Sequence, residues 1–279
     1  METRIYRKGR QARPFKVFKD SLTDLYRSRF LARQWATRDI KGQYRQSILG
    51  ILWLFITPLM TALVWIVLNS SGTVKLSDTG IPYPIYAFSG TLIWSIIVQS
   101  INAPTLNTSA AKSVLSKINF PKEALLLSGF YKLLFNSFPK VLLLIIFLFV
   151  FDVGYHHSLL LLIPVLLSAI FFGFTIGVLL TPIALLYKDI GRLVATGLRF
   201  LMYVTPVVYA IPESGMLRTV MQYNPFTPFI LTARDVATET SPENLEYFFT
   251  VLVLCMPLAF VGLVVYRISI PILVERMNA

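Results

Sequence analysis

The side chains that could do chemistry in this sequence are mostly cations, and they gather where polar sequence meets apolar sequence. Arg38, Lys41 and Arg45 precede an uncharged run that begins at Ile48. Guanidinium and ammonium groups suit phosphate oxygens, so these side chains could hold a lipid phosphate. The alternative is that they only orient the chain in a membrane and contact anionic lipid.

Two further cations, Lys140 and Arg199, lie inside apolar runs. A charge at membrane depth is costly, so such a side chain faces a polar channel or reaches toward the interface and pairs there. The sequence is compatible with both roles.

Motifs of the common catalytic sites are absent from the sequence. It contains no Gly-Lys dipeptide, and hence no phosphate-binding P-loop, and it has no HExxH or GxSxG motif. Ion-coupled transporters usually place carboxylates in their spans, whereas every acid here falls in a loop or at a span end. The one cysteine, Cys255, offers no disulfide or metal cluster. We therefore predict no catalysis, cofactor or metal in this chain, and an energy source on another chain.

The composition is that of an integral membrane protein. Of the 279 residues, 55% are hydrophobic and 14% are charged, and the mean hydropathy is +0.65. Soluble domains carry about 25% charged residues. A net charge of +12 could indicate nucleic-acid binding, but the cations stand beside apolar runs and not on a polar domain, which argues against that class.

Six apolar runs can cross a bilayer core of about 30 Å, and they define the predicted organisation. The predicted transmembrane segments are residues 48–68, 85–101, 124–151, 159–186, 193–209 and 248–266. Residues 1–47 form the N-terminal part, with an amphipathic helix from about Pro14 that lies on the membrane or packs on a partner. Residues 211–246 form a long segment before the sixth span, and residues 267–279 form a tail. Gly173 and Gly177 predict close helix packing in the fourth span.

The charge distribution orients these spans. With both termini inside, 20 of the 26 Lys and Arg residues fall on the inner side and three on the outer side. Cytoplasmic loops of membrane proteins carry such an excess of cations. The sequence therefore predicts a multi-pass plasma-membrane protein with both termini in the cytoplasm.

Four stretches, in the same order, resemble ABC-2 type permeases that export bacterial surface polysaccharides. They are residues 38–53 (RDIKGQYRQSILGILW), 117–121 (KINFP), 187–190 (YKDI) and 223–229 (YNPFTPF). The resemblance covers about residues 20–270. It includes the O-antigen, group 2 capsule and teichoic-acid exporters.

This resemblance implies an all-α fold with six transmembrane helices, an N-terminal interface helix and re-entrant gate helices in residues 211–246. A coupling helix at about residues 107–120 would sit in a cleft of an ATPase. Two permease copies would pair with two ATPase subunits, which would carry ATP and Mg²⁺. The cargo would be a lipid-linked polysaccharide of the O-antigen or capsule type. Alternatives are export of teichoic acid, or of a small lipid or drug; a membrane enzyme would need polar catalytic groups that the spans hardly supply.

Three sets of candidate residues follow from the resemblance and from the residue types. The ATPase-coupling set is Asn107, Lys112, Leu115, Lys117, Ile118, Phe120 and Pro121. The entrance set for a lipid phosphate is Arg38, Lys41, Tyr44 and Arg45. The channel and gate set is Trp94, Lys140, Arg199, Tyr203, Tyr209, Tyr223, Asn224, Pro225, Phe226, Pro228 and Arg234. The aromatic members could stack on sugar rings or could simply face lipid at the membrane interfaces.

Overall fold

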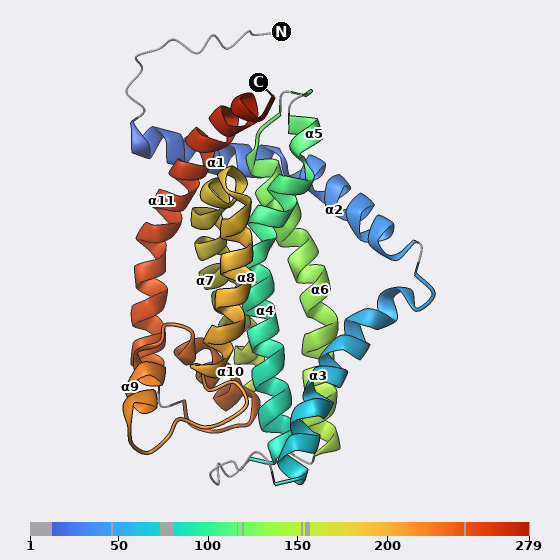
Figure 1. Ribbon diagram of the computed structural model, residues 1–279, viewed down its shortest axis with the longest axis vertical. Helices are drawn as coiled ribbons and strands as arrows, with labels where there is room; N and C mark the ends of the chain where they lie inside the picture. Colours follow the sequence, from blue (N-terminus) through green and yellow to red (C-terminus); the bar gives the residue numbers. More distant parts are fainter. Residues whose placement is uncertain are drawn as a thin grey trace.

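The fold is a bundle of long helices. The computed structural model describes residues 13–45, 47–72, 81–115, 117–118, 120–151, 153, 157–242 and 244–278. In these residues the regular elements are helices, with no strand among them, and five are long and apolar enough to cross a membrane. The five are η1 (Gly50–Leu52) continued by α3 (Trp53–Ser70), α4 (Tyr83–Ala110), α6 (Glu123–Val150), α7 (Leu159–Leu186) and α11 (Leu245–Asn278) (Figure 1). The predicted all-helical membrane architecture is confirmed.

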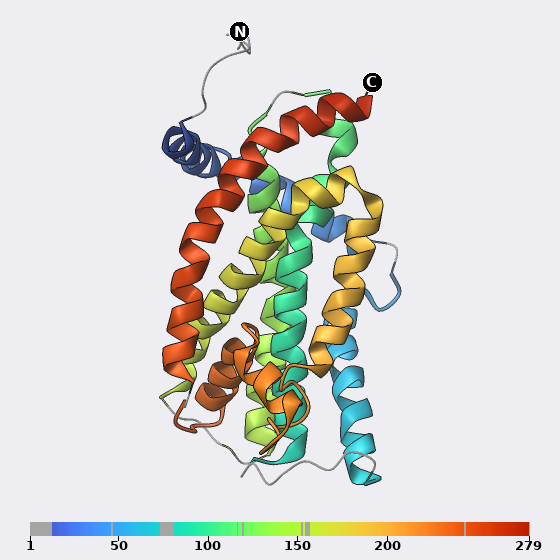
Figure 2. The same ribbon diagram turned by 60° about the vertical axis from the view of Figure 1, so that its left-hand side comes forward.

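Helix α4 lies at the centre of the bundle and packs against α6 and α7 (Figures 1 and 2). Two glycines of α7 allow the close approach of α4. A Cβ atom on Gly177 would lie 2.3 Å from the carbonyl oxygen of Ile101, and one on Gly173 would lie 2.9 Å from that of Ile97. The packing role predicted for the two glycines is confirmed.

Helix α4 continues nine residues beyond the predicted end of the second span at residue 101. Its polar side chains bond to the carbonyl groups of their own helix. Asn102 donates to the Val98 carbonyl over 2.9 Å, and Thr108 donates to the Pro104 carbonyl over 2.8 Å. Such local bonds satisfy polar groups inside a helix. The helix predicted for residues 107–120 is therefore divided between the end of α4 and the single turn of α5 (Lys112–Leu115).

Helix α8 (Lys188–Tyr203) occupies the place of the predicted fifth span, residues 193–209, with different bounds. One residue, Tyr187, separates it from the end of α7, whereas the predicted fourth and fifth spans leave residues 187–192 between them. Its 16 residues span about 24 Å, less than the bilayer core of about 30 Å. The count of six crossings therefore stays a prediction.

Two short helices, α9 (Met216–Tyr223) and α10 (Thr227–Ala237), lie between α8 and α11. They stand at the end of the bundle opposite α1, α5 and the C-terminal end of α11 (Figures 1 and 2). Most of α10 is buried against α4, α7 and α11. Residues 211–246 thus contain two short helices, and the re-entrant gate expected in this segment stays a prediction.

The N-terminal part contains two helices, α1 (Pro14–Arg27) and α2 (Arg29–Tyr44), separated at Ser28. Helix α1 lies across the end of the bundle against α6 and α11, and α2 runs along α6. The Phe18 ring packs on Phe260 of α11, with ring centres 4.8 Å apart, whereas Phe15 and Leu22 are exposed. The apolar side of the predicted amphipathic helix is therefore only partly covered by this chain.

Candidate functional site

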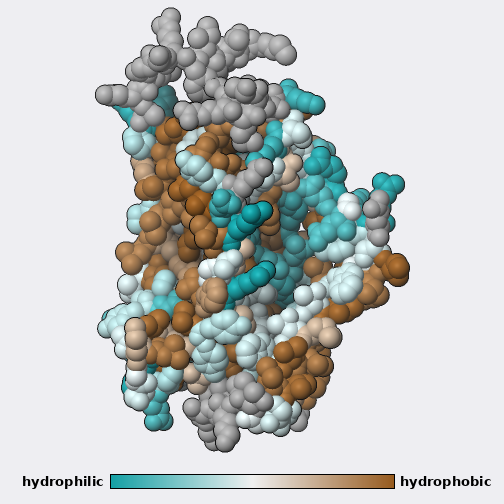
Figure 3. Space-filling model, viewed as in Figure 1, coloured by the Kyte–Doolittle hydropathy of each residue, from teal (hydrophilic) through white to brown (hydrophobic). Residues whose placement is uncertain are grey.

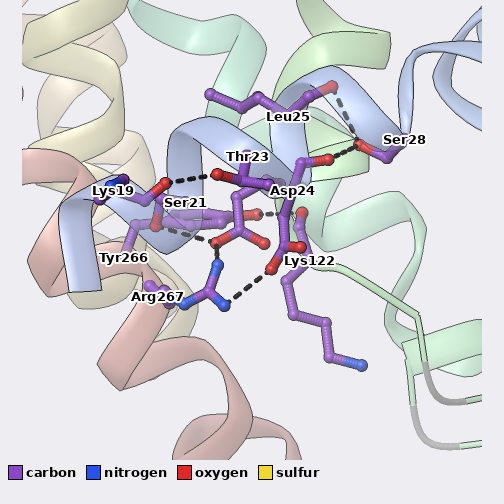
Figure 4. Close-up of polar contacts among 10 residues, drawn as sticks. Lys19, Ser21, Thr23, Asp24, Leu25, Ser28, Lys122, Tyr266 and Arg267 are labelled. Carbon is purple, nitrogen blue, oxygen red and sulfur yellow. Dashed lines mark hydrogen bonds and ion pairs between the residues drawn. The ribbon is translucent and has the colours of Figure 1, made fainter. Parts of the chain in front are cut away.

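A group of charged side chains joins three helices at the end of the bundle that carries α5 (Figure 4). Arg267 of α11 donates to Asp24 of α1 over 2.7 Å and also to Glu123 of α6. Ser21 of α1 donates to the same Glu123 oxygen over 3.0 Å. Because Glu123 is only 2% exposed, its charge depends on these donors. We call Asp24, Glu123 and Arg267 the end cluster.

Tyr266 connects the end cluster to both sides of the segment that carries α5. Its hydroxyl oxygen lies 2.9 Å from Thr108 Oγ1 of α4 and 3.3 Å from the carbonyl oxygen of Lys122. The Tyr266 side chain is fully buried. Because Thr108 and Lys122 flank the segment, the Tyr266 hydroxyl ties both of its ends to α11.

The predicted ATPase-coupling residues differ in their exposure. Asn107 and Leu115 are buried, and Phe120 packs edge-on against Trp35 of α2, with ring centres 4.9 Å apart. The other four are Lys112 and Pro121, which are half-buried, and Lys117 and Ile118, which are exposed. Lys117 and Ile118 are therefore the members of this set most accessible to a partner.

The predicted entrance residues lie on α2 or directly after it, and Arg38 is joined to a charged network. Arg38 donates to Asp39 over 2.9 Å, and Lys132 of α6 donates to the other Asp39 oxygen, also over 2.9 Å. Burial raises the pKa of the Asp39 carboxyl, but hydrogen bonds and charge from Lys132 and Arg38 outweigh this effect and hold the pKa below its ordinary value. Lys41 and Arg45 are exposed.

A cavity of about 460 Å³ lies between α2, α4 and α6. Arg38, Asp39, Asn107 and Ser128 contribute polar groups to its wall. It brings one predicted entrance residue, Arg38, to the same space as one predicted coupling residue, Asn107. The other entrance residues do not line it; among them, Tyr44 is half-buried.

Lys140 of α6 is 4% exposed and donates to Ser95 Oγ of α4 over 2.9 Å. Beside it lies a second cavity of about 190 Å³ between α3, α4 and α6, which we call the Lys140 cavity. The oxygen Oε1 of Gln99 is buried there without a hydrogen-bond partner in the described part of the chain. The polar residues that line the cavity are Thr57, Thr61, Thr91, Ser95, Gln99 and Lys140.

Arg234 of α10, predicted in the channel and gate set, is 1% exposed and holds the chain that follows α8. Its guanidinium donates to the carbonyl oxygens of Val207 over 2.7 Å and Pro206 over 3.1 Å. The same group lies 3.6 Å above the ring of Tyr86 in α4. A Cβ atom on Gly90 of α4 would lie 1.8 Å from the Val207 oxygen, so glycine is required at this crossing.

The predicted channel aromatics also separate into buried and exposed residues. Trp94 and Phe226 are buried and pack edge-on, with ring centres 5.6 Å apart, and Phe226 also contacts Phe172. Tyr203 and Tyr223 are exposed. The last aromatic residue, Tyr209, is half-buried and donates to the Tyr203 carbonyl. The channel and gate set also includes Asn224, which donates to the Val204 carbonyl, Pro225, which is exposed, and Pro228, which is buried in the first turn of α10.

Helix α8 presents one polar stripe to the outside of the chain. Arg192, Thr196, Arg199 and Tyr203 follow one another by four, three and four residues, so they share a face, and all four are exposed. Figure 3 shows hydrophilic side chains over α8 on the face of the molecule that carries it. Arg199 therefore lies open on a polar face, whereas Lys140 lies inside the chain.

Comparison with known proteins shows what this chain is similar to. No protein-family model matches the chain. The O-antigen export system permease protein RfbA of Klebsiella pneumoniae is 25% identical over 235 residues, which cover 82% of this chain and 88% of the relative. The permease of the same name from Myxococcus xanthus is 26% identical over 219 residues, covering 77% and 83%. The chain is therefore similar to O-antigen export permeases over most of its length.

This relationship, together with five helices able to span a membrane, supports a multi-pass transport protein of the inner membrane. It also agrees with a chain that has no catalytic role. Among the described residues, no group of three or more His, Cys, Asp or Glu could hold a metal ion.

Sequence reasoning missed the end cluster and the partners of Lys140. The end cluster combines residues 24, 123 and 267, which no local pattern connects. The polar partners of Lys140 did leave a signal. Thr91, Ser95 and Gln99 of α4 are spaced by four residues, which places three polar side chains on one face of the helix.

Proposed function

We propose that this chain is the membrane permease of an ATP-driven exporter that moves lipid-linked polysaccharide from the cytoplasm across the plasma membrane. One observation carries the proposal: the similarity to O-antigen export permeases extends over most of both chains. A second copy of the chain and two ATPase subunits complete the exporter, and ATP and Mg²⁺ are bound by the ATPase.

In this proposal α8 is the fifth of six crossings. Helix α1, α5 and the C-terminal end of α11 lie at one end of the bundle, and such an arrangement requires an even number of crossings (Figures 1 and 2). Five long helices together with α8 supply that number. The short length of α8 suits a span whose polar stripe faces a water-filled path, because backbone that ends inside the membrane must be covered by protein or line a cavity.

The end that carries α5 is the cytoplasmic side in this proposal, since most of the cations fall there. The ATPase contacts the exposed Lys117 and Ile118. Its movement reaches α11 through Tyr266, which bonds to both sides of the α5 segment, and reaches α1 through the contact between Arg267 and Asp24.

The polysaccharide passes along the polar face of α8, where Arg199 and Tyr203 are exposed. Its lipid phosphate first meets the basic edge on α2, where Lys41 and Arg45 are open to solvent. Helices α9 and α10 form the outer gate. Arg234 fixes α10 to α4, so the movable part of the gate is α9 with its exposed Tyr223.

A deletion of the gene in the source organism tests the proposal. Loss of the permease should remove the polysaccharide from the cell surface and leave its lipid-linked form on the cytoplasmic side. Complementation with the wild-type chain should restore export. Complementation with Arg199→Glu, which reverses the charge of the α8 stripe, should not restore it, whereas Arg199→Lys, which keeps that charge, should. Normal surface polysaccharide in the deletion strain would overturn the proposal and favour a teichoic acid, small lipid or drug as the cargo.

A further inference from the structure

The Lys140 cavity holds a buried cation whose counter-charge the surrounding helices do not supply. Helices α3 and α4 contain no acidic residue, and the one acid of α6 is Glu123. Glu123 lies 17 residues before Lys140, about 25 Å along the helix, and is already bound by Arg267. On the neighbouring α2, Asp39 is bound by Arg38 and Lys132. A buried ammonium without an anion is strongly disfavoured.

The lining of the cavity leaves hydrogen-bond donors for an anion. The Lys140 ammonium has three donors, and one of them is directed to Ser95. The hydroxyls of Thr91 and Ser95 donate to carbonyl groups of their own helix, so their lone pairs can accept from Lys140 or from water. Among the described residues, Oε1 of the Gln99 side chain has no hydrogen-bond partner, and a half-turn of this amide would bring its NH₂ group to the same place.

The size and mouth of the cavity restrict the ligand. Its volume of about 190 Å³ equals that of about six water molecules at about 30 Å³ each, which is enough for a phosphate with a few waters but not for a polysaccharide chain. Thr57 and Thr61 of α3 line the cavity and are exposed, so it opens along α3. A phosphate could enter there while the apolar tail attached to it stays outside.

We propose that the Lys140 cavity binds the phosphate group of a membrane-carried lipid, with Lys140 as the cation and Gln99 as a second donor. Two sources carry this chemistry: an anionic membrane phospholipid, or the lipid carrier of the exported polysaccharide. Only the second source rests on the proposed function. This cavity is separate from the basic edge of α2, so the chain would hold a lipid phosphate at a second place.

Native mass spectrometry of the purified full-length chain tests the proposal with three probes: phosphatidylglycerol, a polyprenyl diphosphate, and diacylglycerol, which lacks phosphate. We expect the wild-type chain to retain a phosphate-bearing lipid at least tenfold more strongly than diacylglycerol. Lys140→Met should weaken that retention at least tenfold, and Lys140→Arg should preserve it. Replacing a buried charge by an apolar side chain of similar volume is often neutral or stabilising, so the variant should fold.

Lys132→Met is the matched control, because it removes another lysine of α6 that already has Asp39 as partner. It should leave lipid retention unchanged. Retention of phosphatidylglycerol would assign the site to a membrane lipid, and selective retention of the diphosphate would assign it to the carrier. Equal retention of all three probes, or a Lys140→Met chain that binds like the wild type, would overturn the proposal. If the deletion strain keeps normal surface polysaccharide while the purified chain still retains a phosphate-bearing lipid, the exporter function is overturned but the lipid site is not.

Discussion

Removal of Arg267 offers the most direct test of how the N-terminal helix is held. In Arg267→Met, Glu123 stays buried with Ser21 as its remaining donor. Breaking a buried ion pair by deleting one partner costs about 3–5 kcal/mol. The contact with Asp24 adds no more than about 1 kcal/mol, because both of those side chains are about one-fifth exposed, at 21% and 22%. We expect the free energy of unfolding to fall by about 3 kcal/mol, the lower end of the range, since Arg267 is not fully buried.

The measurement is unfolding of the purified chain in detergent, combined with a double-mutant cycle. Glu123→Gln removes the buried charge, so in that background the loss caused by Arg267→Met should be much smaller. The expected coupling between the two positions is about 1–3 kcal/mol. Hydrogen exchange should rise in α1 more than in α7 when Arg267 is absent.

The control is Arg192→Gln on α8, whose side chain is 86% exposed and should change stability by less than about 0.5 kcal/mol. Purely additive effects of Arg267→Met and Glu123→Gln would refute the reasoning, because they would mean that the two side chains do not stabilise one another. Unchanged hydrogen exchange in α1 would show that other contacts hold this helix.

Three further outcomes are expected. Gly90→Ala should lower the free energy of unfolding by about 1–3 kcal/mol in the same assay, since the new Cβ would meet the Val207 carbonyl. Gly197→Ala, whose Cβ would have nothing within 4 Å, should leave that free energy unchanged or raise it. Ile118→Asp, at an exposed position, should abolish stimulation of the ATPase without changing unfolding; full stimulation would argue against contact there. The pKa of Asp39 is lower in the folded state than in the unfolded state, so its ionised carboxyl stabilises the fold. This contribution to the free energy of unfolding should be complete above the unfolded pKa of about 4 and should be lost as pH falls through the folded pKa. Lys132→Met should reduce this dependence when unfolding is measured against pH.

The elements that sequence reasoning predicted best are those whose environment is uniform. The fourth span was predicted at residues 159–186, and α7 has those bounds, because 28 uncharged residues between polar ends leave little choice. The end of α4 was predicted too early, since polar residues such as Asn102 and Thr108 can bond to their own helix and need not leave it. The start of α8 was predicted too late, because Asp189 is favourable in the first turn of a helix and does not mark a loop.

Site residues were predictable by type but not by surroundings. The cost of a charge at membrane depth singled out Lys140 and Arg199 alike. The packing of α3, α4 and α6 encloses Lys140 in a cavity, whereas Arg199 lies on an open face of α8. Trp94 illustrates the opposite case. An aromatic ring is equally suited to a sugar, a lipid or a core, and only the contact with Phe226 shows that it packs inside the chain.

The bonds from Arg234 to Pro206 and Val207 also bear on how the chain is made. Arg234 is synthesised 27 residues after Val207, so the two carbonyl groups lack this partner while the ribosome translates α9 and the first part of α10. Unpaired carbonyl groups are costly in lipid. We therefore expect the chain that follows α8 to take its final position only after α10 has docked against α4.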